Sequence, residues 1–318
     1  MENINLTCPR CNQSHFYPLY ASNATCINCG HLFEDYFSTQ KKVLLENHSP
    51  FEVLGSTLLK YKGNQSHVVI PSGITEIAFS AFKDCKSLEI LTLPESLRII
   101  SFSAFENCSN LKTINSAPPL SYIKSCAFKN CTSLINFHFI PGLLEIGCES
   151  FANCTQLQGM SLPHSVERVF SQAFENCVSL THVDILGATH ISKDAFNNCI
   201  NIKTVELYGH LSKGISLSDN SFKDCKNLVS VKADDYDYPI PSMRKAAFNG
   251  CSKLHTVSFH NKEIYLRYFS DNDFICYEKH EKLYYMELRR EFGKCQYCGG
   301  KFRFFNQTCR DCGKKKDY

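Results

Sequence analysis

The stretch AFKDCKSLEILTLP at residues 81–94 recurs along the chain with few changes. Its Ala-Phe-x-x-Cys-x-x-Leu part appears eight times in 318 residues, and successive copies of its cysteine are 23, 23, 23, 23, 22, 26 and 26 residues apart. Such self-similarity indicates a repeat protein, in which one unit cannot bury its apolar face alone and stacked units share a core. The repeat cysteines are Cys85, Cys108, Cys131, Cys154, Cys177, Cys199, Cys225 and Cys251.

Each repeat contains the pattern of a short strand followed by a return segment. In Leu88-x-x-Leu91-x-Leu93-Pro94 apolar residues alternate with others, which suits a strand with one buried face. Ile99 and Ile100 follow, and then the next Ala-Phe segment, which we expect to form a short helical turn. Residues 67–71 align with 90–94 at an offset of 23 and predict a partial first strand.

The strand pattern followed by Ile-x-x-x-Ala-Phe-x-x-Cys-x-x-Leu resembles the BspA-like leucine-rich repeat. The resemblance covers residues 51–262 and implies a leucine-rich-repeat solenoid of about eight full repeats. In such a solenoid a parallel β-sheet lines the concave side, and short helical turns and short strands form the convex side. The resemblance also implies a binding scaffold or a surface adhesin rather than an enzyme.

The chain has 19 cysteines, of which the eight in the repeats are expected to be reduced and buried. Neighbouring units in a parallel sheet lie roughly 4.8 Å apart, yet their side chains run parallel rather than converge, which disfavours bridging. A redox or metal role for this ladder is the alternative. Cys126, Cys148 and Cys276 lie outside the repeat position, and we interpret them as packed or idle thiols.

The remaining cysteines form two pairs of Cys-x-x-Cys motifs, one at each end of the chain. Two such pairs supply the four thiolates of a closed structural zinc site, so residues 1–34 and 293–318 resemble zinc ribbons. A closed site leaves no position for a substrate water, which makes metal catalysis improbable. A ribbon that also contacts a partner is the alternative to a purely structural one. The predicted Zn²⁺ ligands are Cys8, Cys11, Cys26, Cys29, Cys295, Cys298, Cys309 and Cys312.

The C-terminal ribbon is basic. Residues 289–318 contain nine Lys and Arg residues against three acidic ones, with aromatic residues interleaved. Basic and aromatic side chains can bind phosphates and stack on bases, although a lysine-rich tail is also commonly just solvated. Candidate nucleic-acid-binding residues are Lys301, Arg303, Arg310, Lys314, Lys315 and Lys316.

Two further segments connect these parts. Residues 35–50 are a linker, and residues 263–292 are expected to contain a helix from about Asp273, whose role is to cover the last strand of the solenoid. The outward-facing strand residues are polar in the middle of the predicted sheet. An open sheet has no pocket that excludes water, so this surface is either solvated or a protein contact, and catalysis has little support. Candidate partner-binding residues are Asn136, His138, His182, Asp184, Glu206 and Lys232.

Composition and charge fit these expectations. The net charge of +3 does not suggest a chain coated in nucleic acid, and no stretch approaches a membrane span. The first residues lack the basic and apolar regions of a signal peptide, which predicts a cytoplasmic protein. The sequence therefore predicts a non-enzymatic protein–protein interaction scaffold with two zinc ribbons. The alternatives are a nucleic-acid-associated protein acting through the basic ribbon and a surface adhesin.

Overall fold

A computed structural model describes residues 3–7, 10, 12–18, 49–187, 190–208, 215–233, 242–259, 262–273 and 275. The chain divides into two compact units, Met1–Glu52 and Val53–Tyr318. In the first unit, strands β1 (Asn3–Thr7) and β2 (Ser14–Pro18) form an antiparallel hairpin in which Thr7 pairs with Ser14. By sequence, this hairpin brackets the first Cys-x-x-Cys pair, whose cysteines lie outside the described residues.

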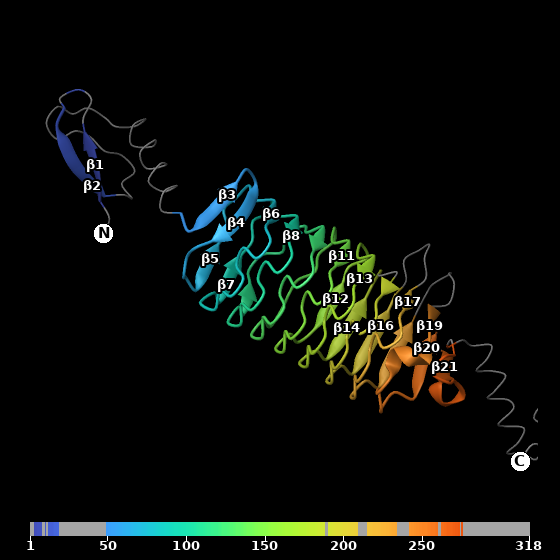
Figure 1. Cartoon of the computed structure of the whole chain (residues 1–318). Coiled ribbons are helices and arrows are strands. Elements are labelled where there is room, and N and C mark those ends of the chain that lie inside the picture. Colours follow the sequence, from blue (N-terminus) through green and yellow to red (C-terminus); the bar gives the residue numbers. More distant parts are fainter. Residues whose placement is uncertain are drawn as a thin grey trace, which may run out of the picture. The chain divides into compact units, whose positions relative to one another are not determined.

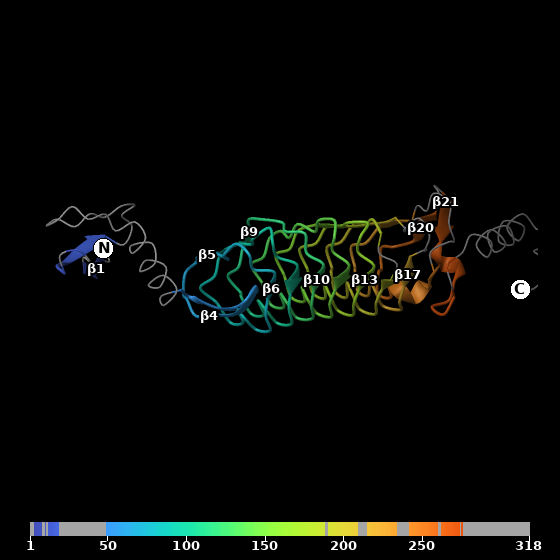
Figure 2. The ribbon, with the colours of Figure 1, turned by 90° about the horizontal axis from the view of Figure 1, so that it is seen from above.

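The described part of the second unit is a solenoid whose turns stack from β4 to β20 (Figures 1 and 2). One side, here called the short-strand side, is a continuous ten-stranded sheet that is parallel from β4 to β19. Its strands are β3 (Phe51–Leu54), β4 (Thr57–Tyr61), β6 (Glu76–Ile77), β8 (Ile99–Ile100), β10 (Tyr122–Ile123), β11 (Glu145–Ile146), β13 (Arg168–Val169), β15 (His190–Ile191), β17 (Ser216–Leu217) and β19 (Ser242–Met243).

The other side, here called the long-strand side, consists of two separate sheets. The three-stranded sheet contains the predicted first strand, because β5 pairs with β7 at the expected offset of 23 residues, His67 opposite Ile90. Its strands are β5 (His67–Val69), β7 (Ile90–Thr92) and β9 (Thr113–Ile114). The six-stranded sheet comprises β12 (Met160–Leu162), β14 (His182–Ile185), β16 (Thr204–Leu207), β18 (Ser230–Ala233), β20 (Thr256–Phe259) and β21 (Lys262–Tyr265).

A column of stacked aromatic rings fills the space between the two sides. The column starts at Tyr61, whose ring lies 4.8 Å from that of Phe82, and continues through the repeat phenylalanines to Phe248. Neighbouring ring centroids are 4.8 to 5.9 Å apart, a spacing at which aromatic pairs attract one another beyond their buried area. The members after Tyr61 are Phe82, Phe105, Phe128, Phe151, Phe174, Phe196, Phe222 and Phe248.

The repeat cysteines are free thiols, as expected, and from Cys108 to Cys251 they are buried. Each of these seven points its thiol at the backbone carbonyl of the phenylalanine in the preceding turn, as in Cys154 Sγ to Phe128 O at 3.3 Å. Burial raises the pKa of the Cys154 thiol, so the sulfur stays protonated and can donate. The ladder therefore joins successive turns without disulfides.

The residue before the repeat cysteine is usually asparagine, and it has a left-handed backbone. Asn107, Asn130 and Asn153 have φ values of 62° to 63°, a conformation that asparagine tolerates better than most residues. The Nδ2 atom of Asn130 donates to Oδ1 of Asn107 at 2.7 Å, and Asn153 donates to Asn130 in the same way. These side chains form a second ladder along the surface.

The prediction of short helical turns in the Ala-Phe segments is mostly wrong. No α-helix occurs in the described part of the chain, and the Ala-Phe segments are turns closed by hydrogen bonds between residues three apart, such as Cys108 N to Phe105 O. Two left-handed residues per turn, such as Ser103 and Asn107, interrupt any helix. In the last copy the first of these positions is Ala246, which is not left-handed, and a 3₁₀-helix forms there, η1 (Lys245–Phe248).

The C-terminal edge of the solenoid is covered by a strand. β21 pairs antiparallel with β20, with Thr256 opposite Tyr265, and the 3₁₀-helix η2 (Leu266–Tyr268) follows it. This strand occupies the edge that a helix in residues 263–292 was expected to cover, and most of that helix lies outside the described residues. No helix in the described part of the chain is long and apolar enough to cross a bilayer.

Candidate binding site

The long-strand side is interrupted at residues 136–140. In the described residues β9 pairs only with β7, and β12 pairs only with β14. The flanking residue Ile135 still keeps the turn-to-turn contacts, since its N–H donates to Lys112 O and its carbonyl accepts from Gln158 N. The backbone N–H and C=O groups of residues 136–140 make no hydrogen bond to any other described residue. This turn therefore presents unused backbone donors and acceptors.

Aromatic residues explain the interruption. Phe137 and Phe139 stand where the earlier repeat has Leu91 and Leu93. The Phe137 ring lies 5.0 Å from that of Phe151, and the Phe139 ring lies 5.5 Å from it, so both crowd against the aromatic column. A phenyl ring is larger than the leucine side chain of the earlier repeat, and we infer that this volume keeps the backbone of residues 136–140 from pairing with its neighbours.

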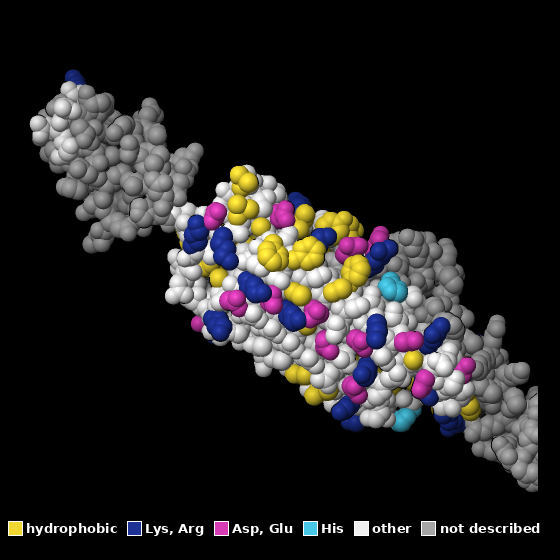
Figure 3. Space-filling view, viewed as in Figure 1, with side chains coloured by type: hydrophobic (Ala, Val, Ile, Leu, Met, Phe, Trp, Pro, Cys, Tyr) yellow, Lys and Arg dark blue, Asp and Glu magenta, His cyan; other side chains and the backbone are white. Residues whose placement is uncertain are grey.

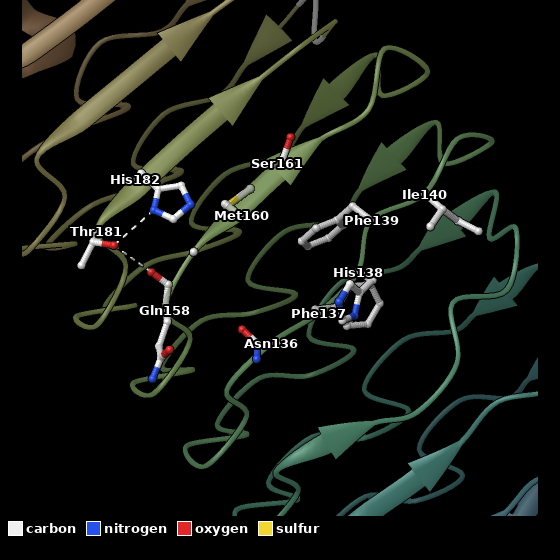
Figure 4. A pocket seen from close by; sticks show the side chains of 11 residues that line it. Asn136, Phe137, His138, Phe139, Ile140, Gln158, Met160, Ser161, Thr181 and His182 are labelled. Atoms are coloured by element: carbon white, nitrogen blue, oxygen red, sulfur yellow. Dashed lines mark hydrogen bonds between the residues drawn. The ribbon is translucent and has the colours of Figure 1, made fainter.

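A hollow of about 510 Å³ opens between this segment and the adjoining strands β12 and β14. His182 reaches from β14 across Gly159, and a β-carbon at Gly159 would come within 2.5 Å of its ring. Glycine is thus required for the imidazole to lie over the hollow. The lining residues are Asn136, Phe137, His138, Phe139, Ile140, Gln158, Gly159, Met160, Ser161, Thr181 and His182 (Figure 4).

The histidines and amides of the hollow are largely unengaged. Asn136 and His138 are exposed and make no hydrogen bond among the described residues. On the opposite wall Thr181 donates to Gln158 O at 3.3 Å, and its Oγ1 lies 3.2 Å from His182 Nδ1 (Figure 4). Phe139 and Met160 add apolar surface, so the hollow combines an apolar base with polar groups, as ligand sites do.

A row of charged side chains continues from the hollow across the next strands. Strand register places Asp184 opposite Glu206, and Glu206 opposite Lys232. Lys232 Nζ lies 3.6 Å from a Glu206 oxygen, and the Tyr208 hydroxyl donates to Glu206 at 2.9 Å. Burial and the neighbouring Glu206 raise the pKa of Asp184, whose carboxylate accepts no hydrogen bond from the described residues. The ionised Asp184 is therefore poorly compensated.

The six predicted partner-binding residues fall on one continuous surface. Asn136, His138 and His182 line the hollow, and Asp184, Glu206 and Lys232 follow it in strand register. Their outward orientation was expected from strand alternation, but the hollow was not. Its sequence signal was the pair of phenylalanines at leucine positions, together with Gly159 at an outward position.

The other candidate residues cannot be placed. All eight predicted zinc ligands and all six predicted nucleic-acid-binding residues lie outside the described residues, so these assignments stay predictions. Within the described part of the chain, no three His, Cys, Asp or Glu side chains gather closely enough to hold a metal ion.

A second exposed surface is apolar. Phe79 and Phe102 occupy the same position of successive turns and are 70% and 51% exposed, and Leu54 of β3 is 71% exposed. Yellow side chains gather where β3, β6 and β8 lie, whereas basic and acidic side chains are interspersed elsewhere on the view (Figure 3). Apolar patches mark contact surfaces, but polar groups are what orient a particular partner, and the hollow has more of them.

Known proteins contain similar repeats. The chain matches the BspA type leucine rich repeat region over residues 52–181, 123–236 and 169–298. The leucine-rich repeat protein TpLRR of T. pallidum has 27% identity and a TM-score of 0.47, with 65% of this chain and 89% of that one covered. A leucine-rich repeat protein from Bacteroides ovatus has 24% identity and a TM-score of 0.42, covering 64% and 66%.

The pneumococcal vaccine antigen PcpA has 17% identity and a TM-score of 0.38, covering 69% of this chain and 70% of its own. No curated protein matches the chain. The family match spans residues 52 to 298, well over half of the sequence. The matched residues include the stacked turns and the buried cysteine ladder described above. The chain is thus a member of the BspA-type leucine-rich repeat family.

Proposed function

We propose that the chain is a non-catalytic scaffold that binds a partner protein on its long-strand side, with the hollow at residues 136–140 as the anchor point. The observation that carries this proposal is the interruption of the sheet. It leaves backbone donors and acceptors unpaired beside a hollow, on the same face as the row from Asp184 to Lys232. The family's general interaction or adhesin role is consistent with such a surface.

The hollow is suited to an aromatic or amide side chain of the partner. Phe139 and Met160 provide apolar contact, while Asn136, His138 and His182 provide hydrogen bonds at the rim. An extended partner segment can also pair with the free backbone groups of residues 136–140, as peptides do when they bind along a sheet. Aromatic anchors in such hollows commonly supply most of the binding energy of an interface.

The row beside the hollow favours a basic residue in the partner. Asp184 lies next to Glu206, and the effect of His182 on it is smaller than those of burial and Glu206, whereas Glu206 has Lys232 at 3.6 Å. A partner Arg or Lys would compensate the Asp184 carboxylate and would lower its raised pKa. We therefore expect the partner segment to carry an aromatic residue followed, within one or two strand widths, by a basic residue.

The experiment is a selection of displayed random peptides on the full-length chain. Enriched peptides should contain the aromatic and basic pair and should bind at least about tenfold more weakly to the Asp184→Asn and Gly159→Val variants, an effect of about 1.4 kcal/mol. Glu145→Gln, on the short-strand side, is the matched control and should leave binding unchanged. Equal binding to all of these variants, or no enrichment of such peptides, would refute the proposal.

We further propose that the two Cys-x-x-Cys motifs at each end of the chain together hold one structural Zn²⁺, in a reducing compartment such as the cytoplasm. Four thiolates are the donor set that zinc takes in closed sites, and short segments of this size need the metal in order to fold. Metal analysis of protein purified without chelator should find two zinc ions per chain. The zinc content should fall to one ion per chain in Cys8→Ser and likewise in Cys309→Ser. An unchanged zinc content in either variant would refute the assignment of that cysteine as a ligand.

A further inference from the structure

Two partly exposed cysteines are joined through their backbones on adjacent turns of the short-strand side. The backbone N–H of Cys126 donates to the backbone carbonyl of Cys148 at 2.9 Å, and both residues are free cysteines. A backbone N–H···O=C bond of this length holds the Cα atoms of the two residues about 5–6 Å apart, inside the range of roughly 4.4–6.8 Å that a disulfide spans. Their placement therefore allows a bond between the two sulfurs.

The offset of the turn-to-turn hydrogen bonds explains why Cys126 bonds to Cys148. Turn-to-turn hydrogen bonds here join a residue to the one 22 positions later, as in Ser103 N to Ser125 O at 3.0 Å, although the repeat itself is 23 residues long. The N–H of a residue here reaches the carbonyl one position before its register partner, so Cys126 bonds to Cys148 and not to Glu149. The approach is close, because a β-carbon on Gly147 would come within 2.5 Å of the Ser125 nitrogen.

The surroundings distinguish this pair from the ladder cysteines. The sulfurs from Cys108 to Cys251 are buried and point at carbonyl groups, which keeps them protonated and out of reach of an oxidant. Burial also raises the pKa of Cys126, with Glu149 and the Cys148 thiol adding to the effect, and Lys129 opposing it. Cys126 and Cys148 nevertheless stay partly exposed, which the ladder cysteines from Cys108 to Cys251 are not.

The segment between the two cysteines is the turn that carries the hollow. Residues 126–148 make one circuit of the solenoid, and this circuit includes residues 136–140, whose backbone lacks the ladder hydrogen bonds of the other turns. A bond between its two ends would restrain this circuit.

We propose that Cys126 and Cys148 form a dithiol modification site, which a low-molecular-weight disulfide such as oxidised glutathione converts to an intramolecular disulfide. One cysteine thiolate attacks a glutathione sulfur, which breaks the glutathione disulfide, forms a mixed disulfide and releases one glutathione. The neighbouring thiolate then attacks the mixed disulfide at the protein sulfur and releases the second glutathione. The two cysteines lose two protons and two electrons, and the glutathione disulfide gains them.

The test maps disulfides in the full-length chain after incubation with oxidised glutathione and trapping of free thiols. Cleavage after basic residues and after glutamate releases Ser125–Lys129 and Ile146–Glu149, each with a single cysteine. A cross-linked pair of these two peptides, cleaved by dithiothreitol, is expected. Recovery of both peptides only as glutathione adducts or as trapped thiols, or a bond from either to another cysteine, would overturn the proposal.

Hydrogen exchange and variants provide the second measurement. Oxidation should slow amide exchange at residues 136–140 by at least about tenfold, and Cys126→Ser or Cys148→Ser should abolish both the cross-link and the slowing. Cys85→Ser, which alters a third half-exposed thiol, is the matched control and should change neither. The cross-link in the unaltered chain is the primary result, so the proposal stays testable if a variant fails to fold. A cross-link without slower exchange would overturn the inference that the disulfide restrains residues 136–140.

Discussion

The two sides of the solenoid follow the same repeat but differ in continuity. On the short-strand side, two-residue strands pair without a break from β4 to β19. On the long-strand side, the ladder stops after β9 and resumes at β12, at the level where Phe137 and Phe139 replace smaller residues. The comparison shows that the stack is held by its turns, since the aromatic column and the thiol ladder run past the gap unchanged. One side can therefore vary locally without loss of the fold.

The largest expected effect is on the aromatic column at the level of the gap. Phe151 contacts the rings of Phe128 and Phe174 in the column and also those of Phe137 and Phe139. Phe151→Ala should lower the free energy of unfolding by about 3–5 kcal/mol, because a fully buried ring is replaced by a cavity. Urea unfolding of the full chain, followed by circular dichroism, measures this. A loss below about 1 kcal/mol, as for a surface substitution, would contradict the inference that the aromatic column holds the stacked turns together.

A smaller effect is expected in the asparagine ladder. Asn153 has a φ of 63° and exchanges side-chain hydrogen bonds with Asn130 and Asn176. Asn153→Ala should cost about 2 kcal/mol, from the loss of hydrogen bonds and from left-handed strain on a β-carbon. Asn153→Gly is the matched control, which removes the hydrogen bonds without the strain and should cost less in the same unfolding experiment. Equal costs would show that the backbone conformation is not the reason for asparagine here.

Restoring the leucines tests the cause of the gap directly. The double change Phe137→Leu and Phe139→Leu should let residues 136–140 pair with their neighbours and should slow their amide exchange. The change in unfolding free energy is expected to stay below about 1.5 kcal/mol, since lost ring contacts offset gained hydrogen bonds. Ile185→Leu, an aliphatic change in β14, should leave exchange at 136–140 as it is. If exchange stays fast in the double variant, ring size does not cause the interruption.

The smallest effect concerns Asp184. Its pKa is raised in the folded chain by burial and by Glu206, so the folded state binds this proton more tightly than the unfolded state does. The ionised carboxylate then destabilises the fold at neutral pH, and this cost disappears as pH falls through the raised pKa and below the usual aspartate range. Asp184→Asn should stabilise the chain at pH 7 by under about 1 kcal/mol. Unfolding at pH 7 and pH 4 should show a gain that shrinks on acidification, and a gain that grows would contradict it.

The repeat period predicted much of this fold. Cysteine spacing gave the number of turns, and strand alternation correctly placed Asp184, Glu206 and Lys232 facing outward. The prediction of helical turns was wrong because the repeat period carries no information on the backbone conformation, which is left-handed at residues such as Ser103. The hollow was missed because phenylalanine and leucine are alike in an apolar pattern and differ only in volume.

The pairing of Cys126 with Cys148 was missed for another reason. The two cysteines are 22 residues apart, and a pattern of 23 separates them into different motif positions. The two residues are adjacent because a backbone N–H bonds to the carbonyl one position before its register partner, which a list of side-chain types does not report. The covering of the C-terminal edge of the sheet was mispredicted for a similar reason. It depends on a reversal of the chain after β20, which lets β21 pair with β20, and not on a helical pattern.

The buried thiol ladder has a consequence for how the solenoid comes apart. Each sulfur from Cys108 to Cys251 belongs to a single turn and is shielded only while that turn and its predecessor stay stacked. In a quasi-one-dimensional array, turns can detach in sequence from an end instead of melting together. The order in which these cysteines become reactive to an alkylating reagent would therefore record the direction of unzipping, turn by turn, with natural probes built into every step.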